Sequence, residues 1–243
     1  MILSLTWLLY SMTAMAQGTG ASDAFFSTER SDEDVSFSIR VGVNASTIVM
    51  GMEDGTRGIN QRRMGFTAGV SMDVPILESL GFQTGVYFVQ KGMKEEAENV
   101  KTTQINGVNV ISSTTKTTGK GNPGYMEVPL LASYRHQFKR KVLLQVSTGP
   151  FLAYGVCGKE RIKTKDNLGL LLDYNVDWFG GEDSMNSLRF RRFDMGWHLG
   201  AGLTFKSGIS LGYAFEAGFY DTGRMENYSL KTRCHTAYLG FVF

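Results

Sequence analysis

Long apolar runs are scarce in this sequence of 243 residues. A transmembrane helix needs about 18 consecutive apolar residues, and no such run follows the N-terminal segment. The sequence therefore excludes a helical membrane protein. Proline and cysteine are also rare, with four and two residues. Two cysteines provide neither a disulfide framework nor the spacing of a metal site, and we expect no metal and no cofactor.

An excess of one charge is absent as well. The chain has 25 Lys and Arg against 23 Asp and Glu. This balance implies no polyanionic partner, and nucleic acid is not an expected ligand. What the chain does have is 29 glycines and 12% aromatic residues. These two features together are typical of strands with one apolar face and one small or polar face.

The N-terminus has the pattern of an export signal. An apolar stretch from Ile2 to Tyr10 precedes Ala14-Met15-Ala16, a small-x-small pattern that signal peptidase accepts. We predict a signal peptide over residues 1–16 with cleavage before Gln17, although no Lys or Arg precedes the apolar stretch. Residues 17–34 are polar without periodicity, which predicts a disordered periplasmic lead-in.

From Val35 to Phe243 the pattern has a period of two, which predicts one β domain over residues 35–243. Eight segments alternate, with the apolar residue of each pair expected to face lipid. They begin at Val35, Gly65, Phe82, Met126, Val142, Phe193, Ile209 and Thr236. Within these segments no charged residue falls on the apolar face, where a Lys or Arg at mid-bilayer costs about 2–4 kcal/mol.

The connections between these segments alternate in length. Short links occupy Val74–Leu80, Lys139–Lys141 and Ser207-Gly208. Long connections occupy Ala45–Met64, Gly92–Gly124, Cys157–Arg192 and Asp221–Arg233. This arrangement predicts an all-β, transmembrane, antiparallel up-and-down barrel of about eight strands, with short periplasmic turns and long extracellular loops. The expected location is the bacterial outer membrane.

A soluble barrel with its apolar face inward is the alternative fold. Its polar face would point to water and should be rich in charged residues, whereas here that face is mostly Gly, Ser and Ala. Small residues suit the crowded interior of an eight-stranded barrel. The membrane barrel with a packed interior is therefore favoured.

Several short motifs resemble those of a known family. They are Gly42-Val43-Asn44, Gly65 to Val70, Gln90-Lys91-Gly92, Tyr125 to Leu131, Gly149-Pro150-Phe151, and Phe193 to Gly196 leading to Gly200-Ala201-Gly202. In order and spacing they resemble the PorT-like outer-membrane β-barrel family, common among Bacteroidetes. The resemblance covers Val35 to Phe243 and implies an eight-stranded outer-membrane barrel. The founding member takes part in secretion and surface attachment, so a component of such a system is one alternative function.

Isolated charges on the inward face form the candidate site. They are Arg40, Lys91, Glu127, Arg135, Asp194, His198 and Glu216. Because buried charges must be paired, we interpret them as a structural salt-bridge network in a filled lumen. A gated conduit is the alternative. A catalytic reading would need His198 as general base with a nucleophilic serine, and no inward serine pairs with it, so we predict no enzyme.

Other expectations concern single residues. Aromatic residues expected to face lipid are Tyr134, Tyr154, Trp197, Phe215 and Phe241. Phe241 and Phe243 match a C-terminal signal for the barrel-assembly machinery, an expected partner during insertion. Cys157 and Cys234 are candidates for a disulfide. Trp178-Phe179 in a long loop is apolar enough to pack over the barrel mouth or to meet a partner.

Two function classes follow from these expectations. The favoured one is a membrane anchor and interaction scaffold that contacts protein partners through its extracellular loops and has a side-chain-filled lumen. The other is a narrow or gated porin-like channel.

Overall fold

The computed structural model describes residues 34–52, 57–105, 108–138, 142–166, 169, 171–179, 190–223 and 228–243. The predicted signal peptide and all of the lead-in except Asp34 lie outside these residues. Among the described residues, no helix is long and apolar enough to cross a membrane.

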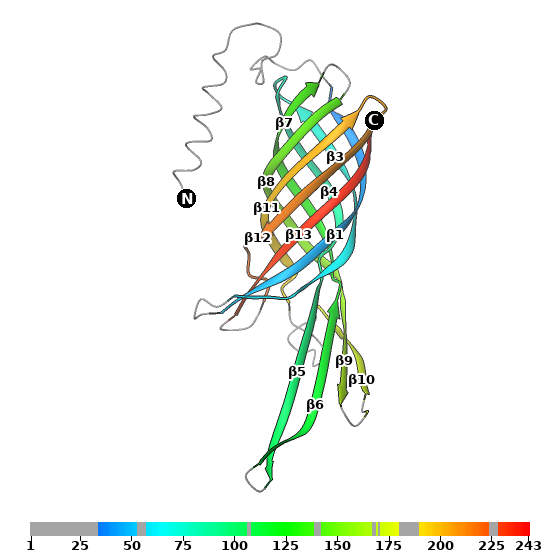
Figure 1. Ribbon diagram of the computed structural model, residues 1–243. Helices are drawn as coiled ribbons and strands as arrows, with labels where there is room; N and C mark the ends of the chain where they lie inside the picture. Colours follow the sequence, from blue (N-terminus) through cyan, green and yellow to red (C-terminus); the bar gives the residue numbers. More distant parts are fainter. Residues whose placement is uncertain are drawn as a thin grey trace.

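Eight antiparallel strands close into a barrel (Figure 1). They are β1 (Ser36–Met52), β3 (Gln61–Pro75), β4 (Leu80–Gln90), β7 (Gly124–Phe138), β8 (Val142–Cys157), β11 (Phe193–Phe205), β12 (Ile209–Gly218) and β13 (Tyr228–Val242). Neighbours in sequence are neighbours in space, and β1 pairs with both β3 and β13, which removes every free edge. A closed barrel pairs all backbone polar groups within the sheet, as a lipid environment requires. The predicted fold class is confirmed.

Alternation along each strand separates a lipid-facing surface from the lumen. On β1, Val41 and Val43 are more than half exposed, whereas Ser38 and Asn44 are buried. β7 repeats the pattern, with Val128 exposed and Glu127 buried. Exposed apolar side chains on one face of every strand are expected where the solvent is lipid rather than water.

The short turns and the C-terminus lie at one end of the barrel (Figure 1). Between β11 and β12, Gly208 has a φ of 81° and donates its N–H to the Phe205 carbonyl at 2.9 Å. This left-handed conformation suits glycine in a three-residue hairpin loop. Residues 139–141, the predicted turn between β7 and β8, lie outside the described residues.

The opposite, extracellular end corrects the sequence interpretation. Three of the four long connections predicted as loops contain strands of their own: β2 (Arg57–Ile59), β5 (Met93–Ile105), β6 (Val108–Gly121), β9 (Lys159–Asp166) and β10 (Leu171–Asp177). β1 and β13 also continue past their predicted ends and stay paired to Met52 and Tyr228. Four of these strands form a sheet in the order β10-β9-β6-β5, called here the extension, which projects beyond the barrel (Figure 1).

The mouth beneath the extension is filled by a hydrophobic cluster, called here the mouth cluster. Its buried members are Ile48, Met93, Tyr125, Phe151, Ala153, Trp178, Phe179, Phe190 and Leu230. Trp178 stacks on Phe190 with ring centroids 4.5 Å apart. A Cβ atom at Gly121 would lie 1.9 Å from the Trp178 ring, so only glycine admits the indole there. Trp178 and Phe179 therefore pack over the mouth.

Candidate functional site: charges in the barrel lumen

Five of the seven predicted lumen charges come together near the extracellular half of the barrel. They are Lys91, Glu127, Asp194, His198 and Glu216, called here the lumen cluster. Lys91 directly follows β4, and its backbone N–H donates to the Pro123 carbonyl at 2.9 Å. The other four project inward from β7, β11 and β12 because they occupy the inward positions of the alternation.

Lys91 is the centre of this cluster. Its Nζ lies 2.6 Å from Glu127 Oε2, 3.3 Å from Glu216 Oε2 and 3.7 Å from Asp194 Oδ2. The side chain is 2% exposed. The ammonium also lies 4.1 Å from the centroid of the Phe151 ring, in cation–π contact. One cation thus ties together carboxylates from three strands.

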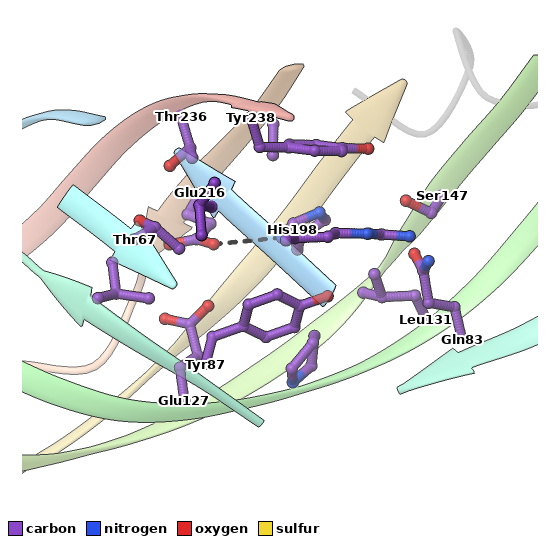
Figure 2. A pocket seen from close by; sticks show the side chains of 15 residues that line it. Thr67, Gln83, Tyr87, Glu127, Leu131, Ser147, His198, Glu216, Thr236 and Tyr238 are labelled. Atoms are coloured by element: carbon purple, nitrogen blue, oxygen red, sulfur yellow. Dashed lines mark hydrogen bonds and ion pairs between the residues drawn. The ribbon is translucent and has the colours of Figure 1, made fainter. Parts of the chain in front are cut away.

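His198 and Glu216 stand directly opposite each other on β11 and β12. His198 Nδ1 lies 3.3 Å from Glu216 Oε1, the pair that the dashed line in Figure 2 joins. Asp194, at the extracellular start of β11, accepts a hydrogen bond of 2.8 Å from the Thr232 hydroxyl. Hydrogen bonds of this kind hold the carboxylates in place around Lys91.

Glu127, His198 and Glu216 also offer ligand atoms within 4.8 Å of one another, close enough to hold a metal ion. However, the Lys91 ammonium lies within 3.3 Å of both glutamates. A metal ion there would be placed beside a positive charge. The arrangement therefore fits an internal ion-pair network better than a metal centre.

Arg40 belongs to a second group further toward the periplasm. The Arg40 guanidinium lies 3.7 Å from Asp73 on the neighbouring strand β3. Asp73 also accepts a hydrogen bond of 3.2 Å from Gln83, and Arg40 lies 5.0 Å from the Tyr238 ring centroid. Asp73 was missed as a partner, although its inward position in the alternation could have indicated it.

The structure does not bring Arg135 into the lumen cluster. Arg135 is buried on the inward face of β7 near its periplasmic end, where its backbone N–H donates to the Ser79 carbonyl at 2.9 Å. A small cavity of about 40 Å³ separates the Arg40 group from the lumen cluster, lined among others by Tyr87, Glu127 and His198 (Figure 2). A water molecule needs about 10–15 Å³ of such space, so this cavity admits only a few.

The outward face carries the predicted aromatic residues. Tyr154, Trp197 and Phe241 are half exposed, and Tyr134 and Phe215 are partly covered. Phe215 packs against His235 with ring centroids 4.8 Å apart. Phe243, at the end of the chain, is 67% exposed. The role of Phe241 and Phe243 in assembly stays a prediction.

The candidate disulfide between Cys157 and Cys234 is not formed in the structure. Cys157 and Cys234 are both free, and only Cys234 is buried. Cys157 lies at the end of β8 and Cys234 on β13, and β11 and β12 separate these two strands. Neighbouring strands are about 4.8 Å apart, so three such spacings exceed the roughly 7 Å that a disulfide spans between Cα atoms.

Three solved structures resemble the chain in fold. Ail of Yersinia pestis, solved in complex with the heparin analogue sucrose octasulfate, is 15% identical with a TM-score of 0.37 and covers 87% of this chain and 100% of its own. OprG of Pseudomonas aeruginosa is 9% identical with a TM-score of 0.39, covering 88% and 97%. Neisserial surface protein A is 11% identical with a TM-score of 0.33, covering 86% and 99%. All three scores are low, so the fold assignment rests on the strand topology.

A family model gives a firmer relation. No curated protein matches this sequence significantly. The model described as "Outer membrane protein beta-barrel domain" matches residues 15–223, most of the chain. This match agrees with the closed eight-stranded barrel and its apolar outer face, which place the protein in the bacterial outer membrane. The chain belongs to the family of outer membrane protein beta-barrel domains.

Proposed function

We propose that this protein is a membrane-anchored interaction scaffold whose working surface is the extension, and that it is not an enzyme. The observation that carries the proposal is the filled lumen. Lys91 and its three carboxylates fill the lumen in the extracellular half of the barrel, and the mouth cluster covers the extracellular end. A side-chain-filled barrel passes no solute and serves as an anchor.

The extension supplies the second part of the argument. Its four strands project beyond the barrel, and β5 pairs with the barrel strand β3 over a short stretch, Gln61 and Arg62 with Lys94 and Met93. Such a sheet is not needed to close the barrel, because β1 and β3 close it already. Structure that adds exposed surface without completing the core is typical of a binding element.

The two cysteines offer a direct test of which side the extension faces. Cys157 is exposed at the extracellular end of β8, and Cys234 is buried within the barrel. We expect a membrane-impermeant maleimide to label intact cells at Cys157. Cys157→Ser should abolish the labelling, and Cys234→Ser should leave it unchanged. Labelling of Cys157 only after cell lysis would contradict the proposal, because the extension would then face the periplasm.

A narrow or gated channel is a second candidate. The favouring observation is that three carboxylates surround one lysine in the lumen, a negative balance that would attract cations. Uptake of small solutes into proteoliposomes separates the two functions. We expect no uptake by the wild-type barrel, and uptake that Trp178→Ala increases would favour the channel.

Within the family, we propose that the chain is a PorT-like member. The support is the order of short motifs along the sequence, from Gly42-Val43-Asn44 to Gly200-Ala201-Gly202. A secretion role would require partner proteins in the same membrane. Cross-linking of intact cells through Cys157 tests it, because a partner at the extension would be captured in a complex of defined mass.

A further inference from the structure

One face of the extension carries a dense array of positive charge. On β9 a Lys or Arg occupies every second position from 161 to 165, and on β6 two lysines flank Thr118 at the same spacing. With one more lysine at the start of β5, these side chains share one face. The six cations are Lys94, Lys116, Lys120, Arg161, Lys163 and Lys165, called here the basic face. They line a shallow hollow of about 470 Å³ with Thr118 and a single carboxylate, Glu96.

The strand register places like charges side by side. Lys94 pairs with Lys120, and Lys120 pairs with Arg161. Further from the barrel, Lys116 pairs with Lys165 on one side and with Glu98 on the other. Like charges directly opposite each other destabilise a sheet. The folding of the extension therefore gives no reason for this arrangement, whereas binding of an anion does.

Acidic neighbours neutralise only part of the array. Lys94 pairs with Glu96 at 2.7 Å, and Asp173 pairs with Arg161 at 2.7 Å and with Lys163 at 3.3 Å. The Arg161 hydrogen bonds lower the pKa of Asp173 to about 2, so this carboxylate stays charged at neutral pH. Glu98 stands opposite Lys116 on the same face. Three acids against six cations leave the basic face with a net positive charge.

The basic face is turned away from the barrel axis. Met93, next to Lys94, is buried in the mouth cluster, and Glu160, next to Arg161, is also buried. Because side chains alternate along a strand, Lys94 and Arg161 lie on the other side of the sheet. That side faces outward from the extension rather than over the mouth.

The height of the basic face above the membrane selects the ligand. Gly124 pairs with both Gln90 and Cys157, the last register that the barrel strands share. Lys120 is four residues beyond it and Lys116 eight, and each residue advances about 3.3 Å along the strand. The cations thus stand about 13 to 26 Å beyond the barrel rim along the strands, in the layer of saccharide chains rather than of acyl chains.

The lining of the hollow disfavours nucleic acid. Single strands bind on aromatic side chains that stack with bases, and none of the residues that line this hollow is aromatic. Lysine ammonium groups bind phosphate as point charges without a stacking partner. The hollow therefore suits phosphate groups on a flexible, sugar-based chain.

We propose that the basic face binds the phosphorylated saccharide chains of glycolipids in the outer leaflet around the barrel. This inference rests on the proposed function, in which the extension is the working surface. The near balance of charge over the whole chain, 25 basic against 23 acidic residues, conceals this local excess. A basic cluster near an anionic surface gains about fivefold in affinity for each lysine.

The test measures binding of purified full-length protein in detergent to core-only lipopolysaccharide, intact or enzymatically dephosphorylated. We expect the intact form to bind and the dephosphorylated form to bind more than tenfold more weakly. Lys116→Gln with Lys165→Gln should weaken binding more than tenfold. Glu96→Gln should strengthen it, because it removes the one carboxylate of the hollow. Lys206→Gln, in the periplasmic turn, is the control that should change nothing.

Equal binding of the two lipopolysaccharide forms would overturn the inference, as would unchanged binding by the Lys116/Lys165 double variant with wild-type heat-modifiable gel migration. Binding of dextran sulfate without binding of lipopolysaccharide would also overturn it, because the ligand would then be a soluble polyanion. Proteoliposome uptake tests the proposed function separately. A barrel that excludes solutes and binds no lipopolysaccharide would contradict this inference alone.

Discussion

Charged side chains are buried and paired in the lumen, whereas on the extension they are exposed and only partly paired. In the lumen, Lys91 is 2% exposed and has three carboxylates within 3.7 Å. On the extension, Lys116 and Lys165 are exposed and face each other across a strand pair. An unpaired charge in the interior costs several kcal/mol, whereas water screens it at the surface. Buried charges in this molecule therefore serve structure, and the unbalanced charges in solvent are available to a ligand.

The largest expected effect is the difference in stability loss when one lysine is removed from the lumen and one from the extension. Lys91→Met leaves three buried carboxylates without their cation, and breaking a buried pair costs about 3–5 kcal/mol. Lys116→Met removes an exposed charge, and such changes alter stability by about 0.5 kcal/mol or less. Guanidinium unfolding in detergent micelles measures both free energies of unfolding. Similar losses from the two variants would contradict the distinction between the regions.

A substitution at the junction between the barrel and the extension should destabilise the neighbouring strands of the extension and leave the barrel unchanged. Trp178 is fully buried under the extension and stacks on Phe190. Replacing a buried Trp with Ala costs about 3–5 kcal/mol, and we expect Trp178→Ala to lower the free energy of opening of β9 and β10. Hydrogen exchange measures this by segment.

Trp197→Ala is the matched control for that variant. Trp197 lies half exposed on the lipid face of β11, so its loss should leave exchange in the extension unchanged. Faster exchange throughout the barrel after Trp178→Ala would show that extension and barrel are one cooperative unit.

A smaller effect concerns pH. Glu160 of β9 is buried, and its burial together with the nearby Glu95 raises its pKa to about 7, although Arg63 opposes the shift. A carboxyl whose folded pKa is raised binds more protons in the folded state. The extension should therefore become less stable as the pH rises from about 4.5 to 7.

Hydrogen exchange of β9 at pH 5 and pH 8, corrected for intrinsic rates, checks this direction. Glu160→Gln should remove most of the pH dependence and stabilise the extension at pH 8. A wild-type extension whose stability rises with pH would contradict the assignment.

The sequence predicts the barrel far better than the extension, for a physical reason. Each barrel strand has lipid on one side and a crowded lumen on the other, so a residue such as Val41 differs in character from its neighbour Gly42. The extension has no such contrast. Thr114 to Thr118 of β6 mix threonine and lysine, which gives no hydrophobic period. The β-branched threonines favour a strand, and they were the one indication of β6 in the sequence.

The candidate site was only partly predictable for a related reason. Alternation places His198 and Glu216 on the inward face, and the short turn fixes their opposition, so this pair follows from the sequence. The partner of Arg40 depends on how its long side chain reaches diagonally from β1 to Asp73 on β3. The central place of Lys91 depends on how strands β4, β7, β11 and β12 converge, which alternation alone does not specify.

The central claim is that the lumen is closed by its own side chains, and planar-bilayer recording of the purified barrel tests it most directly. We expect no steady channel openings from the wild-type protein, because Lys91 with its carboxylates and the mouth cluster fill the extracellular part of the lumen, and the cavity beside them holds about 40 Å³. Steady openings of the wild-type barrel, with an ion selectivity that Lys91→Met changes, would contradict it.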